Sequence, residues 1–262
     1  MLKTGWARCA FFATISSAAA FEGQWNKTFT VPGRADLRIE VTDGGITVHA
    51  WDRNTIEARV TTIGWKIGPS EVRVDDRQTG DRVEIDVRVP RSHITFGHYS
   101  VRLDLQVPRE LRAQIHTGDG RISANGLAGE IRLSTGDGSI EADSVDGILG
   151  AKTGDGRLRA SGRWDRLDLH TRDGSVEAEA RSGSKMSGSW RVETGDGSIK
   201  LRLPDKFGAD LEAHTGDGKI TVEFPVTVSG AVRNTEFRGK LNGGGELLTV
   251  HTGDGAIHVE RI

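Results

Sequence analysis

Apolar and polar residues alternate along most of this chain, and glycine-rich turns interrupt the alternation at short intervals. Ile131 and Leu133 precede one such turn, Ile140 and Ala142 follow it, and the residues between them are polar or charged. A period of two residues is typical of a β-strand with one buried face. No segment keeps the 3.6-residue period of a helix, and glycine interrupts every unit. The pattern therefore predicts an all-β protein of short strands.

The turns repeat as TGDG, or as TRDG in one copy, and successive copies are 18, 18, 18, 23, 21 and 37 residues apart. A fixed short period is the signature of a solenoid, and longer steps are loops inserted on constant coils. Each unit holds two strands and two turns, and stacked units bury the apolar faces together. We therefore expect a single-domain β-solenoid, a parallel β-helix with coils of about 18 residues. The turns begin at Thr117, Thr135, Thr153, Thr171, Thr194, Thr215 and Thr252.

Each turn threonine has the parity of the buried residues, so we expect it to point inward or to lie at the corner. Stacked threonines can hydrogen-bond along the ladder. The same parity argues against ice binding, which needs a flat outward row of threonines. Arg172 stands where the other copies have the first glycine, which indicates that this position tolerates a side chain.

The first 20 residues differ from the rest of the chain. Lys3 and Arg8 are followed by an apolar run that ends in Ala18, Ala19 and Ala20. This order is typical of a secretory signal peptide with an AxA cleavage site. The run is too short to span a bilayer, and no later apolar run is long enough. We therefore expect an exported, soluble mature protein without a transmembrane segment.

Residues 21–110 carry a weaker form of the repeat. Their alternation predicts one coil around the turn at Thr42–Gly45 and a β-hairpin that turns at Gln78–Asp81. We expect this region to cap the stack, because an open coil end would pair with another chain. Residues 111–262 are the regular TGDG solenoid. The insertion at 225–247 is expected to form a flap or cap over the last coil, although it is also a plausible functional loop.

Composition and charge argue against a few classes of function but do not indicate one. The 35 basic and 37 acidic residues give a formal net charge of -2, which argues against nucleic acid as the partner. The 35 glycines and 6 prolines fit many tight turns. The single cysteine, Cys9, lies in the N-terminal segment, so the rest of the chain has no disulfide or cysteine nucleophile.

The repeated aspartates are the most distinctive candidate site. In register they would lie about 5 Å apart, the spacing of neighbouring strands. Calcium takes six to eight oxygen ligands, and calcium-binding β-rolls carry a repeated Gly- and Asp-rich turn at half this period. One carboxylate per coil leaves such a site short of ligands. The alternative, which we favour, is that each aspartate accepts hydrogen bonds from the amides of its own turn. The row comprises Asp119, Asp137, Asp155, Asp173, Asp196, Asp217 and Asp254.

Four histidines, each three residues before a turn aspartate, form a second candidate site. A transition-metal site could form where His214 and His251 lie on adjacent coils beside Glu193. Equivalent positions elsewhere hold Ser134 and Lys152, so no ligand set is maintained and solvated strand residues are the simpler interpretation. The four histidines are His116, His170, His214 and His251. We predict no metal and no cofactor.

An enzyme needs a cleft in which acid and base converge. Polysaccharide-cleaving enzymes on parallel β-helices place carboxylates and basic residues along one face, and both kinds are present here. They repeat evenly, however, whereas catalytic residues usually break a repeat. The sequence contains no nucleophile elbow, P-loop or dinucleotide fingerprint. We therefore predict no catalytic residues.

Several motifs together carry a resemblance to a known family. The TGDG turns, the stretch ITVHAWDRN at Ile46–Asn54, and the closing FPVT at Phe224–Thr227 followed by GGG and a last TGDG resemble the DUF4097 adhesin-type family. These are bacterial β-strand-repeat proteins, similar to the adhesin-head GIN family. The resemblance covers nearly everything from residue 30 onward and implies a right-handed β-solenoid, usually at the envelope, without catalytic residues.

The sequence thus predicts a non-catalytic, exported binding or structural module of adhesin type, in the periplasm or at the cell surface. Its partner is an envelope protein or a glycan. Two alternatives stay open: a carbohydrate-active enzyme on a β-helix, and a calcium-binding protein similar to a β-roll.

Overall fold

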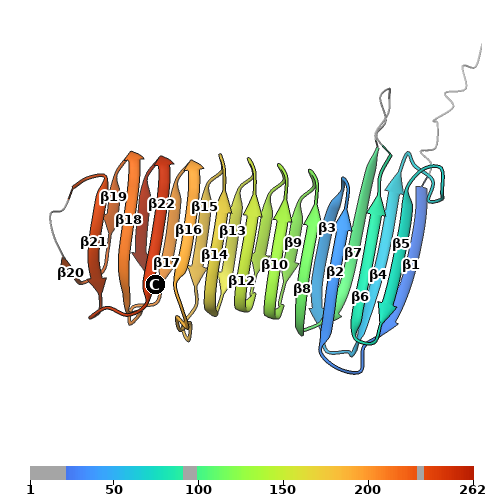
Figure 1. Cartoon of the computed structure of the whole chain (residues 1–262), viewed down its shortest axis with the longest axis horizontal. Helices are drawn as coiled ribbons and strands as arrows, with labels where there is room; N and C mark the ends of the chain where they lie inside the picture. Colours follow the sequence, from blue (N-terminus) through green and yellow to red (C-terminus); the bar gives the residue numbers. More distant parts are fainter. Residues whose placement is uncertain (1–21, 91–98, 229–232) are drawn as a thin grey trace, which may run out of the picture.

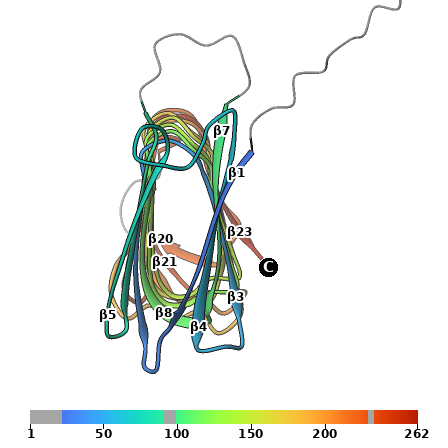
Figure 2. The ribbon, with the colours of Figure 1, turned by 90° about the vertical axis from the view of Figure 1, so that its right-hand side faces the viewer.

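The computed structural model describes residues 22–90, 99–228 and 233–262. The predicted signal peptide at 1–20 lies outside the described residues. Two long β-sheets face each other and run the length of the molecule, with the N-terminal strands at one end of the stack (Figure 1). Seen along the stack, the sheets enclose one narrow interior (Figure 2). The predicted all-β solenoid is therefore confirmed.

Within the described residues, eleven strands form one sheet and twelve form the other. In spatial order, the 11-stranded sheet comprises β1 (Glu22–Thr30), β4 (Thr55–Ile63), β7 (Ser100–Pro108), β3 (Gly45–Trp51), β9 (Ile122–Asn125), β11 (Ile140–Asp143), β13 (Leu158–Gly162), β15 (Val176–Ala180), β17 (Ile199–Leu203), β23 (Ile257–Arg261) and β19 (Ile220–Val222). The 12-stranded sheet comprises β20 (Val226–Val228), β21 (Glu236–Leu241), β18 (Ala209–Asp217), β22 (Leu247–Asp254), β16 (Trp190–Asp196), β14 (Trp164–Thr171), β12 (Asp146–Thr153), β10 (Ala128–Thr135), β8 (Glu110–Thr117), β2 (Ala35–Val41), β6 (Arg82–Arg88) and β5 (Arg73–Thr79).

The coils from β8–β9 to β16–β17 are parallel and follow chain order. Successive coils are 18 residues apart where the repeat is most regular: Ile131 pairs with Leu149, and Ile140 with Leu158. The predicted alternation also holds, because Ile140 is buried at 1% exposure and the next residue, Glu141, is exposed. The apolar side chains of both sheets meet in one continuous core.

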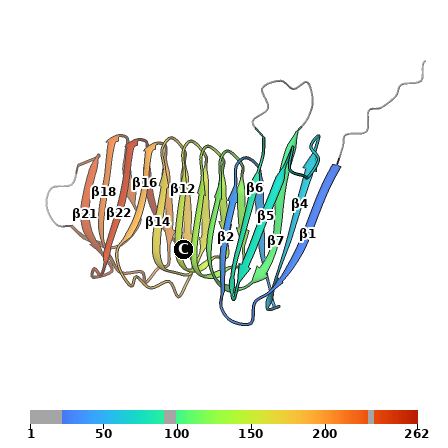
Figure 3. The same cartoon turned by 45° about the vertical axis from the view of Figure 1, so that its right-hand side comes forward.

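The chain departs from sequential stacking at its C-terminal end. The last coil, β22–β23, lies between β16–β17 and β18–β19, so the red strand β22 separates the orange strands β16 and β18 (Figure 1). The C-terminus consequently lies beside the body of the stack and not at its tip (Figure 3). The insertion at 225–247 contributes β20 and β21, and β21 pairs antiparallel with β18. It therefore borders the coil β18–β19. From the sequence we had expected it to cover the last coil of the chain, which is β22–β23.

The N-terminal end also departs from the simple repeat. The coil β2–β3 pairs with β8–β9 and then with β6 and β7, while β5, β4 and β1 add antiparallel strands at the ends of the sheets. β1 runs obliquely across the open end of the stack (Figure 2). It buries Phe29, and its Lys27 forms an ion pair with Asp76 of β5. A charged residue on the end strand disfavours pairing with another chain.

Candidate binding site

The TGDG corner is held together from inside by threonine. All seven turn threonines are buried, with at most 5% of their surface exposed. Each Oγ1 donates to a glycine carbonyl of the neighbouring coil: Thr153 donates to Gly138 at 2.7 Å, and Thr215 to Gly255 at 2.8 Å. The predicted inward position of the threonines is therefore confirmed, and it leaves their hydroxyls unable to form an outward array.

The last glycine of each turn packs against the backbone of the neighbouring coil. A Cβ at Gly138 would overlap the carbonyl oxygen of Gly120, and a Cβ at Gly156 would overlap that of Gly138. This close approach, and not a special φ angle at these two residues, explains why the position is glycine. A Cβ at the first glycine of a turn, such as Gly154, also meets a glycine carbonyl, so Arg172 is an exception and not a sign of general tolerance.

The turn aspartates lie outside the same corner. All seven are exposed, and Asp254 lies between Asp196 and Asp217, so the row departs from chain order. Among the hydrogen bonds of the described residues, none joins these carboxylates to an amide of their own turn. The expectation that each aspartate closes its turn in this way is therefore wrong, because the threonine hydroxyl and the glycine backbone make the corner's contacts.

The turn aspartates and the histidines do not gather into larger clusters within the described structure. Residues 22–90, 99–228 and 233–262 contain no group of three or more His, Cys, Asp or Glu side chains placed to hold a metal ion. Arg172 interrupts the acidic row by binding Asp155 at 2.7 Å and approaching Asp173 at 3.5 Å. His214 and His251 do lie on adjacent strands, where their rings stack with centroids 5.3 Å apart.

Along the C-terminal half of the 11-stranded sheet, the side chains of the outward face form ion pairs. Arg159 binds Glu177 at 2.8 Å, and Arg202 lies between Glu177 at 2.9 Å and Glu260 at 3.4 Å. Lys200 completes this charge ladder by binding Glu260 at 2.9 Å. The hydrogen bonds from Arg159 hold the pKa of Glu177 below its ordinary value, against the effect of partial burial, and Lys200 does the same for the pKa of Glu260. These side chains satisfy one another and leave little free for a ligand.

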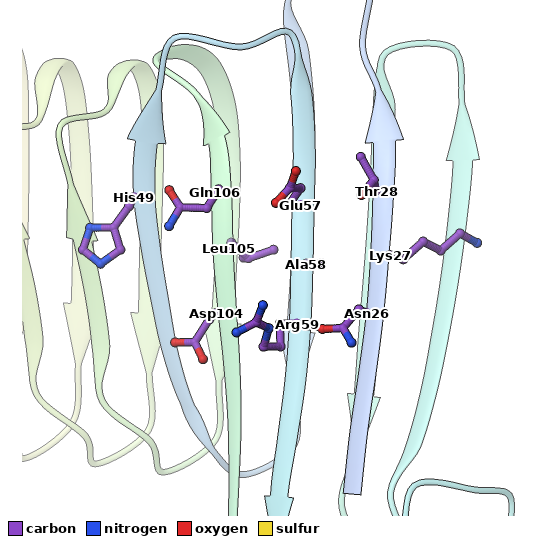
Figure 4. Close-up of a pocket in the computed structure, with 10 residues that line it drawn as sticks. All are labelled: Asn26, Lys27, Thr28, His49, Glu57, Ala58, Arg59, Asp104, Leu105 and Gln106. Atoms are coloured by element: carbon purple, nitrogen blue, oxygen red, sulfur yellow. Dashed lines mark hydrogen bonds between the residues drawn. The ribbon is translucent and has the colours of Figure 1, made fainter.

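The N-terminal end of the same face is hollowed. A depression of about 480 Å³ lies over β1, β4, β7 and β3, which we call the polar hollow (Figure 4). Its floor is the sheet itself, at Ala58 and Leu105, and its sides are polar side chains. Lys27 belongs to its lining but points away toward β5. The lining comprises Asn26, Lys27, Thr28, His49, Glu57, Ala58, Arg59, Asp104, Leu105 and Gln106.

Strand register arranges the polar side chains of the hollow in two rows. Asn26, Arg59 and Asp104 are cross-strand neighbours in one row. Thr28, Glu57, Gln106 and His49 are neighbours in the other row.

Most hydrogen-bonding side-chain groups of the hollow have no partner within the described part of the chain. Arg59 donates from Nε to Asn26 Oδ1 at 3.1 Å, and Gln24 donates to the same oxygen at 3.3 Å. The terminal nitrogens of Arg59 have no partner among the described residues, and Glu57 has Arg53 at 3.8 Å. For Asp104, Gln106 and His49, the part of the chain that the structure describes supplies no side-chain hydrogen bond or ion pair. The hollow therefore presents donors and acceptors that the charge ladder lacks.

None of these residues was singled out from the sequence. The available signal is weak: they have outward parity on strands of the region where the repeat becomes irregular. The structure brings together residues from position 26 to position 106 through the spatial order β1–β4–β7–β3. Fold and geometry together define a β-solenoid with a polar depression at its N-terminal end.

Comparison with known proteins places the chain in a family. The sequence model of Toastrack DUF4097 matches residues 30–260, and the chain belongs to this family. None of the curated proteins matches it. It is similar to a "putative cell adhesion protein" from Clostridium sporogenes, with 13% identity and a TM-score of 0.46 over 93% of this chain and 100% of that chain. It is equally similar to a "putative adhesin" from Bacteroides fragilis, with 13% identity and a TM-score of 0.46 over 91% and 97% of the two chains. Similarity at this level carries no conclusion about function.

Proposed function

We propose that this chain is an exported, non-catalytic β-solenoid that serves the bacterial envelope as a binding module of adhesin type. The observation that carries the proposal is the polar hollow. There Asp104, Gln106 and His49, on the strands of one sheet, present polar groups that have no side-chain partner among the described residues. Groups held on strands are already positioned for a ligand, which lowers the entropy lost on binding. The partner is an envelope protein or a glycan.

A catalytic role is the alternative, because two carboxylates, Glu57 and Asp104, line the hollow. A carboxyl group that acts as a general acid usually lies in an apolar environment that keeps it protonated. The side chain of Glu57 is 48% exposed and stands on an open sheet face, which favours binding over catalysis. An assay for new reducing ends on envelope polysaccharides tests this. If the wild type releases new reducing ends, and Glu57→Gln and Asp104→Asn each abolish that release, the protein is an enzyme instead.

Export is supported by the sequence of residues 1–20. Within the described residues, no helix is long and apolar enough to cross a bilayer. We expect the mature chain to begin at or near Phe21. N-terminal sequencing of protein recovered from the envelope or medium measures this directly. An intact Met1 on cytoplasmic protein would contradict export.

The binding function is tested with the secreted protein and fractionated bacterial envelopes. We expect saturable binding to a membrane, wall or surface-polysaccharide fraction, with no chemical change in that fraction. Gln106→Ala, in the hollow, should weaken binding. Gln114→Ala, the matched exposed glutamine on β8, should not. Binding to no envelope fraction would contradict the proposed function.

A further inference from the structure

We propose that the polar hollow binds an uncharged, polyhydroxylated ligand, that is, a neutral glycan. This inference rests on the proposed binding function and names the ligand class of its site. It follows from three properties of the hollow: the kinds of hydrogen-bonding groups, the balance of charge, and the shape.

The hydrogen-bonding groups of the hollow suit hydroxyls. A hydroxyl both donates and accepts, so a surface that recognises several of them needs both kinds of group close together. Asp104 and Glu57 accept, and Gln106 does both. The terminal nitrogens of Arg59 donate, and so does the side-chain amide nitrogen of Asn26, whose oxygen already accepts from Arg59 and Gln24. Carboxylate, amide and guanidinium groups are planar and can engage two neighbouring hydroxyls at once. The two rows place such groups on adjacent strands, about 4.8 Å apart.

The balance of charge disfavours an ionic ligand. Arg59 has the carboxylate Asp104 as one cross-strand neighbour and Asn26 as the other. Glu57 in the adjacent row is offset by Arg53, whose guanidinium lies 3.8 Å from the Glu57 carboxylate. The positive charge of Lys27 is directed to Asp76. An anionic ligand would face Asp104 and Glu57, and a cationic ligand would face Arg59. A neutral ligand meets neither repulsion.

The shape favours an extended polar ligand. A volume of about 480 Å³ lies within the range of small-ligand sites, roughly 300–1,000 Å³. Ala58 and Leu105 are the apolar residues of its lining, and both side chains are buried. An apolar ligand would have to cover the polar groups of both rows without hydrogen-bonding to them, which costs free energy. A chain of sugar units can lie along the strands and hydrogen-bond to both rows.

The test uses the full-length gene product, secreted by the cells that express it, on an immobilised array of neutral, acidic and amino-sugar glycans. Glycans immobilised at high density raise the local ligand concentration, so that weak binding at a single site can still be measured. We expect binding to neutral glycans, with little dependence on salt between 50 and 500 mM, about a tenfold range that strongly screens charge–charge attraction. Asp104→Ala and Gln106→Ala should each weaken binding at least tenfold. Glu141→Ala and Gln114→Ala, at exposed positions outside the hollow, should bind as the wild type does.

Each other outcome is decisive. Neutral-glycan binding that all four variants retain equally would overturn the assignment to the hollow. Binding restricted to charged glycans, or to an envelope protein, would overturn the ligand class while leaving the proposed binding function in place. Absence of binding to both the array and the envelope fractions would overturn both proposals. Thermal melting of each variant separates loss of binding from loss of fold.

Discussion

The regular coils and the N-terminal end use the same sheet differently. In the coils, parallel strands in register bring outward charges of opposite sign together, and Arg159, Glu177 and Arg202 satisfy one another. At the N-terminal end, β4 runs antiparallel to both of its neighbours, β1 and β7. There Asp104 and Arg59 are cross-strand neighbours, yet Arg59 donates to Asn26 instead.

The difference indicates where in a repeat protein a ligand-binding site can form. A regular repeat favours side chains that bond along the stack, because the same contact recurs at every coil. Where the repeat ends, neighbours change from strand to strand, and polar groups are left for a ligand. Substitutions in the buried and turn positions of the coils should therefore lower stability and leave binding unchanged. Substitutions in the hollow should weaken binding and leave stability unchanged.

The largest expected effect is in the core of the coils. Ile140→Asp buries a charge without a partner, because Ile140 is 1% exposed. It should cost more than about 4 kcal/mol of unfolding free energy. Glu141→Lys, one residue further and exposed, should change stability by less than about 0.5 kcal/mol. Thermal melting compares the two variants. Equal melting temperatures would show that the inward and outward faces are wrongly assigned.

The next effect is at the close contact between turns. Gly138→Ala brings a Cβ onto the carbonyl of Gly120, and the backbone must move to accept it. We expect a loss of about 3 kcal/mol. Gly150→Ala on β12 is the matched control, because the nearest atom to its Cβ would be Arg132 Cγ at 3.8 Å. That variant should be neutral or up to about 1 kcal/mol more stable. Chemical denaturation measures both, and an equally unstable Gly150→Ala would undermine the contact argument.

A smaller effect is expected from the threonine ladder. Thr153→Val keeps the shape of the side chain but removes the donor to the Gly138 carbonyl. The loss should be about 1 kcal/mol. Thr249→Val, on the outward face of β22, has no such bond among the described residues and should be neutral. If both variants unfold at the same denaturant concentration, the ladder contributes nothing measurable.

Alternation of apolar and polar residues was enough to predict the coils, because a period of two assigns each residue to one face. Ile140 and Glu141 are on the predicted sides. The order of coils at the C-terminal end was not predictable in the same way. Every coil offers its neighbour the same threonine hydroxyl and glycine carbonyl, so the sequence does not say that β22 enters between β16 and β18.

The side chains of the candidate sites were harder to predict. A Gly-Asp-Gly turn indicates where the aspartate lies along the chain but not what its carboxylate contacts. The hollow was missed because its members come from four strands whose adjacency depends on the irregular N-terminal pairing. Asn26 and Asp104, both neighbours of Arg59, are far apart in the sequence.

The charge ladder also predicts a dependence on pH. The pKa of Glu177 and the pKa of Glu260 are lowered in the folded chain, so each group stabilises the fold above its unfolded pKa of about 4.3. That stabilisation is lost as pH falls below about 4.3 through the folded pKa. Because the pairs are partly exposed, we expect a few tenths of a kcal/mol for each. Glu177→Gln should reduce the fall in melting temperature between about pH 5 and pH 3, and Glu141→Gln should not. Parallel curves for Glu177→Gln and wild type would contradict the ladder's contribution.

The smallest effect is expected at the acidic row. Asp137 is exposed and accepts no hydrogen bond from its own turn within the described structure, so Asp137→Asn and Asp137→Ala should both lie within about 0.5 kcal/mol of wild type. Relief of repulsion between neighbouring carboxylates favours a slight gain for both. A calcium site predicts something else: wild type should melt higher in millimolar calcium than in chelator, and Asp137→Asn should lose that difference. We expect identical melting temperatures with and without calcium for all three proteins. A calcium-dependent rise confined to the wild type would make the row a binding site, and the regular coils would then carry a function of their own.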